Sequence, residues 1–285
     1  VMFVQDVTQK EQAVRRNFPV IGRLRYFLEN LGVYLRQYFF ANDREEQPFN
    51  RSTRNWIYRM AKGLGGIVGF GSTNDMREPG TLIFVNSPYP QLEEDCMPTP
   101  AVTIGGFCGD QAFVAKRIFN ISGMSFGALS SVAVESLSRG AASAGCWINT
   151  GEGGLASYHL IGDCDRIYQI GTAKYGVRDK NGKLSDDKLR EVAAHEQVKM
   201  FEIKMSQGAK PGKGGILPGR KVNEEIAKIR GIPVGKTSSS PNRFPEIKNS
   251  SDLLGMIQHI REVTGKPVGF KAVMGDKNWM HDLCK

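Results

Sequence analysis

Phe119-Asn-Ile-Ser-Gly-Met-Ser-Phe-Gly127 is the stretch of this sequence that decides the fold. It reads as a short strand, 119–122, that ends in a glycine-flanked loop, and an Ala/Ser-rich helix is expected to follow over 128–144. Strands that alternate with helices in this way favour a parallel sheet with crossover connections. Further strands are expected at 146–149, 200–205 and 267–273, and further helices at 186–197, 223–230 and 251–264.

Glycine-rich sequence follows the first three of these strands, on the side where a (β/α)8 barrel carries its active site. A complete barrel takes about 250 residues, and the chain stops just past its fourth expected strand. The sequence therefore predicts an α/β fold with about the first four β/α units of a (β/α)8 TIM barrel. The same comparison predicts that the chain is the N-terminal portion of a longer protein.

The 285-residue chain is 40% hydrophobic and 24% charged, as in ordinary globular proteins. This composition excludes a mainly disordered or collagen-like chain. No apolar run reaches the roughly 18 residues of a membrane span, and no signal-peptide pattern is present. The five cysteines include no C-x-x-C pair. They favour reduced thiols in a cytoplasmic protein and predict no metal site within the chain.

Residues 1–110 are expected to form a helical and loop-rich N-terminal extension, and residues 111–285 the barrel portion. Apolar side chains recur at helical spacing over 20–40, with arginines on the opposite face. A basic helix on a membrane surface is one interpretation, but a helix that packs on its own domain is favoured. A second short helix is expected at 52–62.

The net charge of +9 comes from residues 111–285, because acidic and basic residues balance over 1–110. A basic excess there suits an anionic ligand or substrate. No zinc-finger spacing, RNA-recognition signature or dense basic run is present, so nucleic acid is not expected as a partner.

Gly123-Met-Ser-Phe-Gly127 matches the G-x-S-x-G nucleophile elbow of serine hydrolases in its strand, turn and helix context. Such an enzyme also needs a histidine, and none stands in an obvious loop after a strand. The other interpretation is that Ser125 and its neighbouring amides hold a cofactor at a helix N-terminus. The histidines that a hydrolase could use are His195, His259 and His281.

Two further motifs offer charged groups among glycines. Asn149-Thr-Gly-Glu-Gly-Gly154 allows the backbone to approach a flat ligand closely, and Glu152 within it suits acid/base chemistry or the orientation of a polar group. Gln207-Gly-Ala-Lys-Pro-Gly-Lys-Gly-Gly215 offers Lys210 and Lys213, which suit carboxylate or phosphate binding. Its spacing does not fit a P-loop.

Lys271 lies inside the apolar strand expected at 267–273. A lysine that is buried there needs a partner. One interpretation pairs it with a carboxylate. The other makes it a cation that stabilises negative charge on a bound ring, as at flavin N1.

These segments, in this order, resemble the FMN domain of glutamate synthase. The resemblance covers roughly residues 115–275, and the N-terminal part is similar to the extension of shorter, stand-alone FMN-binding members. The residues that carry the resemblance are Ile121-Ser-Gly-Met-Ser-Phe-Gly-Ala-Leu-Ser130, Asn149-Thr-Gly-Glu-Gly-Gly154, Gln207-Gly-Ala-Lys-Pro-Gly212, Leu217-Pro-Gly219 and Phe270-Lys-Ala272.

The resemblance implies a (β/α)8 barrel with FMN at the C-terminal ends of its strands. It implies reduction of 2-iminoglutarate, formed from 2-oxoglutarate and ammonia, by a hydride from reduced FMN. Glu152 and Lys271 would be catalytic, and Lys210 and Arg230 would hold the carboxylates of 2-oxoglutarate. The FMN-binding residues that it implies are Ser125, Gly127, Asn149, Gly153, Gln207 and Lys271.

The resemblance also has consequences for partners. Nitrogen would arrive as free ammonia or from an amine donor, and electrons from a donor protein or an NAD(P)H-linked subunit. A 3Fe-4S cluster would need residues beyond this chain, and association with the inner face of the membrane would need a segment before Val1. Lys213 and Ile216 depart from the Glu and Gln that are frequent in the family. A serine hydrolase and a non-catalytic barrel relative are the alternatives.

Overall fold

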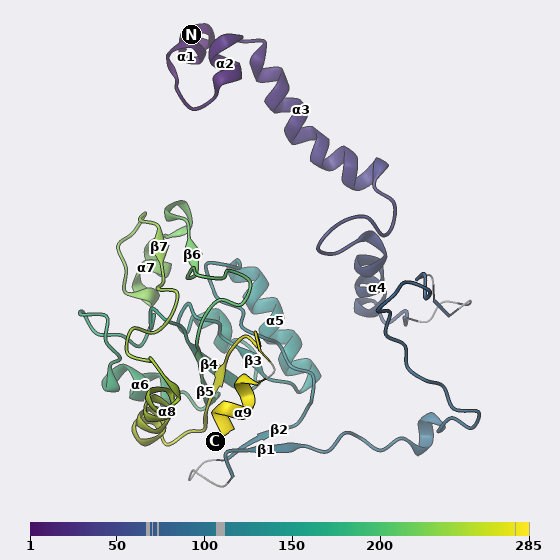
Figure 1. Ribbon diagram of the computed structural model, residues 1–285, viewed down its shortest axis with the longest axis vertical. Coiled ribbons are helices and arrows are strands. Elements are labelled where there is room, and N and C mark those ends of the chain that lie inside the picture. Colours follow the sequence, from purple (N-terminus) through teal and green to yellow (C-terminus); the bar gives the residue numbers. More distant parts are fainter. Residues whose placement is uncertain (67–68, 70, 73, 107–111, 277, 285) are drawn as a thin grey trace. The chain divides into compact units, whose positions relative to one another are not determined.

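The computed structural model of the chain describes residues 1–66, 69, 71–72, 74–106, 112–276 and 278–284. It divides the chain into two compact units, Val1–Pro90 and Gln91–Lys285 (Figure 1). The boundary expected between residues 110 and 111 lies outside the described residues.

The first unit is helical. Its helices are α1 (Met2–Thr8), α2 (Ala13–Asn17), α3 (Gly22–Leu35), which continues as a π-helix over Arg36–Phe40, and α4 (Arg51–Ala61). The expected helices at 20–40 and 52–62 are thereby confirmed. None of the helices in the described part of the chain is long and apolar enough to cross a membrane.

A buried carboxylate ties the first three helices together. Asp6 is fully buried and accepts hydrogen bonds from Arg15 at 2.7 Å, from Arg23 at 2.8 Å and from the Val20 amide at 2.9 Å. The hydrogen bond from Arg23 is the main reason why the pKa of Asp6 lies far below its usual value. The ends of α1, α2 and α3 are therefore joined by charge-assisted hydrogen bonds.

The apolar side chains of α3 are not covered in this way. Ile21, Phe27 and Tyr34 are each more than 60% exposed, and the described residues of the first unit form no apolar core around them. The apolar spacing over 20–40 favours a helix that packs on its own domain. The described residues of the first unit do not provide such packing for α3.

The second unit is built on a parallel sheet in the order β3-β4-β5-β8. Each strand lies beside the previous parallel strand of the chain, which is the winding of a (β/α)8 barrel. Within the described residues the sheet is open, so the structure shows a mixed α/β fold in which a closed barrel is not formed. The strands are β3 (Ile148–Asn149), β4 (Arg166–Ile170), β5 (Val198–Lys204) and β8 (Val268–Lys271).

The strand expected at 119–122 is reduced to one parallel bridge, Ile121 to Ile148, and β4 is not among the expected strands. All five residues of β4 are buried, yet it contains Arg166 and Gln169 and does not read as an apolar run. Arg166 satisfies its guanidinium with the carbonyls of Ile161 and Gly162 at 3.1 Å. Loop carbonyls can therefore replace the carboxylate that a buried arginine usually needs.

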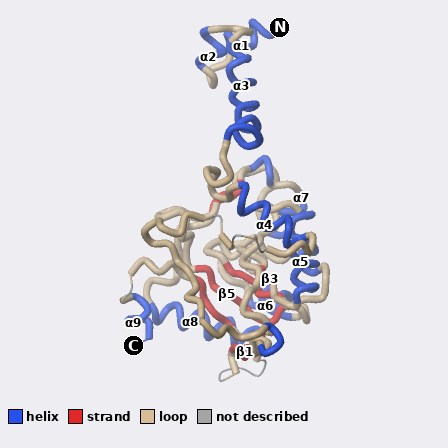
Figure 2. The backbone as a smooth tube through the Cα atoms, turned by 90° about the vertical axis from the view of Figure 1, so that its right-hand side faces the viewer, coloured by secondary structure: helices blue, strands red, loops and turns tan. Residues whose placement is uncertain are grey.

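The four helices expected in the second unit are confirmed: α5 (Ser131–Ala144), α6 (Asp186–Ala193), α7 (Glu224–Arg230) and α8 (Ser250–Thr264). Each begins at a Ser or Asn whose side chain accepts a backbone hydrogen bond, as is common at helix N-termini. In Figures 1 and 2 helices α5, α6 and α8 border the sheet, with α6 and α8 side by side. The remaining elements are α9 (Trp279–Cys284), the pairs β1 (Val102–Ile104) with β2 (Phe113–Ala115) and β6 (Ile216–Leu217) with β7 (Ser238–Ser239), and 3-10 turns at Glu93–Asp95, Ser157–Leu160 and Gly219–Lys221.

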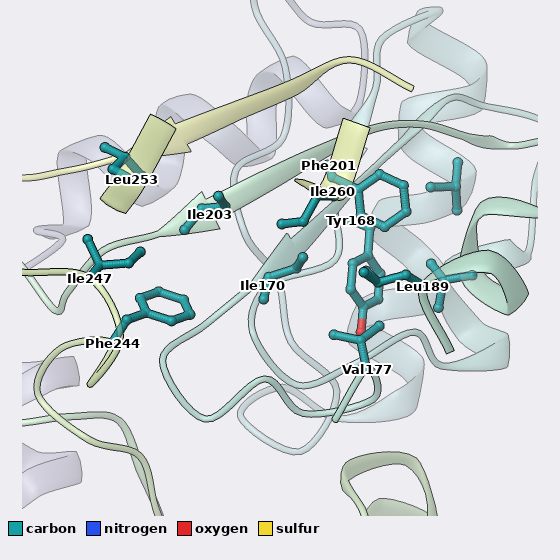
Figure 3. Close-up of a cluster of buried hydrophobic side chains, with 12 residues drawn as sticks. Tyr168, Ile170, Val177, Leu189, Phe201, Ile203, Phe244, Ile247, Leu253 and Ile260 are labelled. Carbon is teal, nitrogen blue, oxygen red and sulfur yellow. The ribbon is translucent and has the colours of Figure 1, made fainter. Parts of the chain in front are cut away.

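The largest apolar core lies between the sheet and α6 with α8. Figure 3 shows side chains of β4 and β5 in this cluster together with residues of both helices. Tyr168 and Phe201 meet edge to face at 5.6 Å between ring centroids. Gln169 follows Tyr168 in β4, and Glu202 follows Phe201 in β5. Because side chains alternate along a strand, Gln169 and Glu202 face the other side of the sheet. That side carries the polar groups described next.

Candidate functional site

Polar side chains from three neighbouring strands meet on the face of the sheet opposite this core. Glu202 of β5 accepts hydrogen bonds from Asn149 of β3 at 2.9 Å and from Gln169 of β4 at 2.6 Å. Asn149 in turn accepts from the Gly151 amide at 2.9 Å. Glu202 therefore fixes the orientation of both amides and, through Asn149, the start of the loop that contains Glu152.

Glu152 lies in this loop and joins a second group of hydrogen bonds. Its Oε1 accepts from Gln207 at 2.6 Å, and Lys204 lies 3.6 Å from its Oε2. Lys204 also donates to the Gln207 Oε1 at 2.9 Å. A β-carbon built on Gly171 or on Gly215 would lie 2.6 Å from Glu152 atoms. At Gly171 one of these atoms is the Glu152 β-carbon, so a larger residue there would displace the loop, whereas at Gly215 it would displace the carboxylate end of the Glu152 side chain.

A cavity of about 240 Å³ opens beside Glu152 at the C-terminal ends of the strands. Five of the expected site residues line it: Ser125, Glu152, Gln207, Lys210 and Arg230. The other lining residues are Gly123, Ala128, Gly151, Gln169, Tyr175, Lys204, Gly215, Ile216, Leu217 and Ser240.

Four expected site residues lie outside the lining of this cavity. Asn149 is buried beneath it. Gly127 and Gly153 pack against Arg230: β-carbons there would lie 3.3 Å and 3.0 Å from its Nη2. Lys271 is exposed at the end of β8, in register with Lys204 of β5. Among the described residues Lys271 has no carboxylate partner, so the interpretation that pairs it with one is not supported.

Arg230, the last residue of α7, is 6% exposed and has few partners. Its Nη2 donates to the Phe126 carbonyl at 3.1 Å, while its buried Nε has no partner among the described residues. Burial lowers the pKa of Arg230, but an arginine keeps its proton in proteins. The cavity wall therefore contains a positive charge that makes no ion pair with a carboxylate among the described residues, although Glu152 is near enough to act on its pKa.

The glycines of 149–154 have close neighbours within the protein. A β-carbon on Gly151 would lie 2.7 Å from the Ser125 amide, and one on Gly154 would lie 2.9 Å from Ile229. These glycines let the loops pack closely on one another. Gly151 also lines the cavity, so the approach of a flat ligand to this backbone stays a prediction.

The structure does not assemble a serine hydrolase around Ser125. Helix α5 begins only at Ser131 and is capped by Ser130, so Ser125 lies in the preceding loop and not at a helix N-terminus. His159 is the histidine next to this loop, and both of its ring nitrogens bond the backbone, at Met124 and at Ala156. In the part of the chain that is described, no histidine is hydrogen-bonded to Ser125.

His195, in the turn before β5, and His281, on α9, are exposed, and neither is hydrogen-bonded to Ser125 among the described residues. His259 on α8 pairs with Asp186 of α6 at 2.9 Å, beside the helix layer. Burial lowers the pKa of His159, which keeps this ring neutral and bound to the backbone. Within the described residues the hydrolase alternative therefore has no histidine in place to act as the base for Ser125.

Sequence reasoning missed four residues of this site: Gln169, Tyr175, Glu202 and Lys204. Gln169 was missed because it lies in β4, a strand that the sequence pattern did not indicate. Glu202 and Lys204 alternate with Phe201 and Ile203, and this period of two could have placed both on one face of the expected strand.

Comparisons with known proteins identify the family of the chain. Residues 91–283 match the family model described as a conserved region in glutamate synthase. The chain therefore belongs to the glutamate synthase family, which is a family of oxidoreductases.

Two relatives named glutamate synthase large subunit-like proteins cover much of the chain. The one from Bacillus subtilis (strain 168), YerD, is 38% identical over 99% of this chain and 61% of its own length. The one from Rhizobium meliloti (strain 1021) is 31% identical over 81% of this chain and 51% of its own length. An archaeal-type glutamate synthase (NADPH) from Thermotoga maritima is 41% identical over 52% of this chain. The chain thus spans less than two thirds of the curated relatives it matches.

Proposed function

We propose that this chain forms the part of an FMN-dependent glutamate synthase that holds the flavin ring and the oxo acid. The reaction is reduction of 2-iminoglutarate, formed from 2-oxoglutarate and ammonia, to L-glutamate. One observation carries the proposal: the cavity at the strand ends contains Lys210 and Arg230, neither paired with a carboxylate among the described residues, next to Glu152.

The donor set suits FMN, whose ring presents carbonyl oxygens and ring nitrogens. Ser125 and Gln207 line the cavity with hydrogen-bonding groups, and Lys271 places a cation at the adjacent strand end. Asn149 does not line the cavity, but it accepts a hydrogen bond from the Gly151 amide and so would position this part of the lining. Reduced FMN supplies a hydride when bound, and a cation near the ring stabilises the negative charge of the reduced form.

Lys210 and Arg230 suit the two carboxylates of 2-oxoglutarate. A guanidinium binds a carboxylate with two parallel hydrogen bonds, and such bonds strengthen where water is excluded. Ile216 and Leu217 provide an apolar wall in the same cavity. Gly127 and Gly153 contribute by leaving room for the Arg230 guanidinium.

Glu152 is the group suited to handle nitrogen and protons. Imine formation from an oxo acid and ammonia releases water, and reduction then adds a hydride to carbon and a proton to nitrogen. The Glu152 carboxylate can accept hydrogen bonds from incoming ammonium, while Gln207 and Lys204 hold it in place. Electrons would come from a donor protein or an NAD(P)H-linked subunit, and nitrogen from ammonia or an amine donor.

The test uses the full-length protein, loaded with FMN, reduced with dithionite and mixed anaerobically with 2-oxoglutarate and ¹⁵N-ammonium. We expect ¹⁵N-labelled glutamate in amounts close to the bound flavin, measured by mass spectrometry. Arg230→Met should weaken the apparent affinity for 2-oxoglutarate about 30-fold or more, because it removes one partner of a buried charge pair. Lys210→Met should weaken it less, because Lys210 is exposed. Lys228→Met, on the exposed face of α7, is the matched control. Absence of labelled glutamate, or an equal loss in the control, contradicts the proposal.

A further inference from the structure

Tyr175 lies in the loop that follows β4 and contributes its ring to the wall of the cavity. The ring is 6% exposed. The Arg230 guanidinium lies 5.3 Å from the ring centroid, and that of Arg178 lies 4.9 Å from it. Both distances are in the range where an aromatic face attracts a cation. Tyr175 therefore contacts the one cation of the cavity that is both buried and without an ion pair to a carboxylate in the described structure.

Both the side chain and the backbone of Tyr175 are held by hydrogen bonds. Its hydroxyl shares a short hydrogen bond with Ser238 of β7, and its carbonyl accepts from the Tyr168 hydroxyl at 3.0 Å. The preceding residue, Lys174, has φ of +53° and pairs with Glu246 at 2.7 Å. Such a conformation is uncommon for a residue other than glycine. The loop is thus held in place by contacts with the segment between α7 and α8.

Arg230 has little else to orient it. Among the described residues its guanidinium donates one hydrogen bond, from Nη2 to the Phe126 carbonyl, and one hydrogen bond does not fix the plane of the group. Van der Waals neighbours at Gly127 and Gly153 limit its position on one side. The face of the Tyr175 ring supplies the remaining support, since it is the aromatic group that contacts the guanidinium.

We infer that Tyr175 is a positioning residue: its ring holds the Arg230 guanidinium so that the free donors meet a carboxylate of the oxo acid in a fixed geometry. This inference rests on the proposed function. Because a planar guanidinium recognises a carboxylate by direction as well as by charge, loss of the ring weakens oxo-acid binding although Arg230 remains.

The experiment compares Tyr175→Leu and Tyr175→Phe with wild type in the full-length protein. Calorimetry gives the Kd for 2-oxoglutarate, and steady-state assays give KM for 2-oxoglutarate and for ammonia. We expect Tyr175→Leu to raise Kd and KM for 2-oxoglutarate about 10-fold, the size of a desolvated cation–π contact, with KM for ammonia unchanged. Tyr175→Phe keeps the ring and should stay within about twofold of wild type.

Phe244→Leu is the matched core control, because Phe244 is a buried aromatic residue that does not line the cavity. It should lower the melting temperature as Tyr175→Leu does but leave KM for 2-oxoglutarate unchanged. Fluorinated phenylalanines incorporated at position 175 form a second series that keeps the shape and weakens the negative ring face. In that series Kd should rise with each added fluorine, even if Tyr175→Leu fails to fold.

The inference is overturned by a fluorinated series with constant Kd. It is also overturned by an equal rise of KM for ammonia and for 2-oxoglutarate in Tyr175→Leu, or by a rise of KM for 2-oxoglutarate in Phe244→Leu, since either would show general loosening. A wild-type protein that binds no 2-oxoglutarate removes the proposed function and the inference with it. Wild-type binding with unaffected variants removes the positioning role alone.

Discussion

The two units of this chain are held together by different forces. In the first unit a single buried carboxylate, Asp6, joins three helices, while the apolar residues of α3 are exposed. In the second unit the sheet buries a continuous cluster that includes Tyr168 and Phe201 (Figure 3). Apolar burial is non-directional and sums over many contacts, whereas a charge-assisted network depends on a few atoms. The units should therefore respond to opposite kinds of substitution.

Phe201→Ala should have the largest effect. Phe201 is fully buried between β5 and the helix layer, and truncation of such a side chain costs about 3–5 kcal/mol of unfolding free energy. Chemical denaturation, followed by hydrogen exchange of residues 91–285, measures it. The matched change in the first unit, Phe27→Ala, should cost less than about 0.5 kcal/mol, because Phe27 is 61% exposed. Equal costs would show that the two units do not differ in this way.

Glu202→Gln should have the next largest effect. It replaces the acceptor of two amide hydrogen bonds with a neutral group, and hydrogen bonds to charged groups contribute about 1.5–3 kcal/mol. We expect a loss of about 1–2 kcal/mol and reduced flavin content, because Asn149 and Gln169 lose their fixed orientation. Absorbance at the flavin band and denaturant unfolding measure the two effects. The exposed control Glu191→Gln should change neither, and an unaltered flavin content in Glu202→Gln would separate this network from the site.

Acidification should affect the first unit through Asp6. The folded-state pKa of Asp6 is lowered from 3.8, chiefly by the Arg23 hydrogen bond. The stabilisation is therefore complete above the unfolded value of 3.8 and is lost as the pH falls from there toward the folded value. Hydrogen exchange of residues 1–40 should accelerate over that window, with residues 148–204 less affected. Asp6→Asn should exchange fast already at neutral pH and show little further change, and a variant that keeps the wild-type pH profile would refute the role of Asp6.

The smallest effect is expected for Glu29→Gln. Its ion pair with Arg25 joins exposed side chains of α3 at 2.9 Å, and solvent screens such pairs so that they contribute little to stability. The same hydrogen-exchange assay should barely distinguish this variant from wild type and should lose even that difference in high salt. A loss as large as that of Asp6→Asn would mean that exposed pairs, and not the buried carboxylate, hold the first unit.

The helices were predictable because residues at their own ends mark where they begin and end. Ser130, Asn223 and Asn249 cap helix starts, and Gly145 and Gly231 follow helix ends in the left-handed conformation. Strand β4 was not predictable from its own residues, because the partners that satisfy buried Arg166 are carbonyls of the preceding loop. Local patterns cannot report such compensation.

The site divides in the same way. Glycine-rich motifs that are recognisable in the sequence contain Glu152, Gln207 and Lys210. Tyr175 and Glu202 gain their importance only through contacts with residues distant in the chain, Arg230 and Asn149. The period of two in β5 indicates the face of Glu202, but sequence spacing does not indicate which distant residues Tyr175 and Glu202 contact.

The most direct test of the central claim is the absorbance of the FMN-loaded, dithionite-reduced full-length protein under anaerobic conditions. We expect flavin absorbance to return when 2-oxoglutarate and ammonium are added together, and to stay bleached with either alone. In Arg230→Met the return should require a far higher concentration of 2-oxoglutarate. A protein that takes up no flavin, or a reduced flavin that is indifferent to both substrates together, would contradict the account.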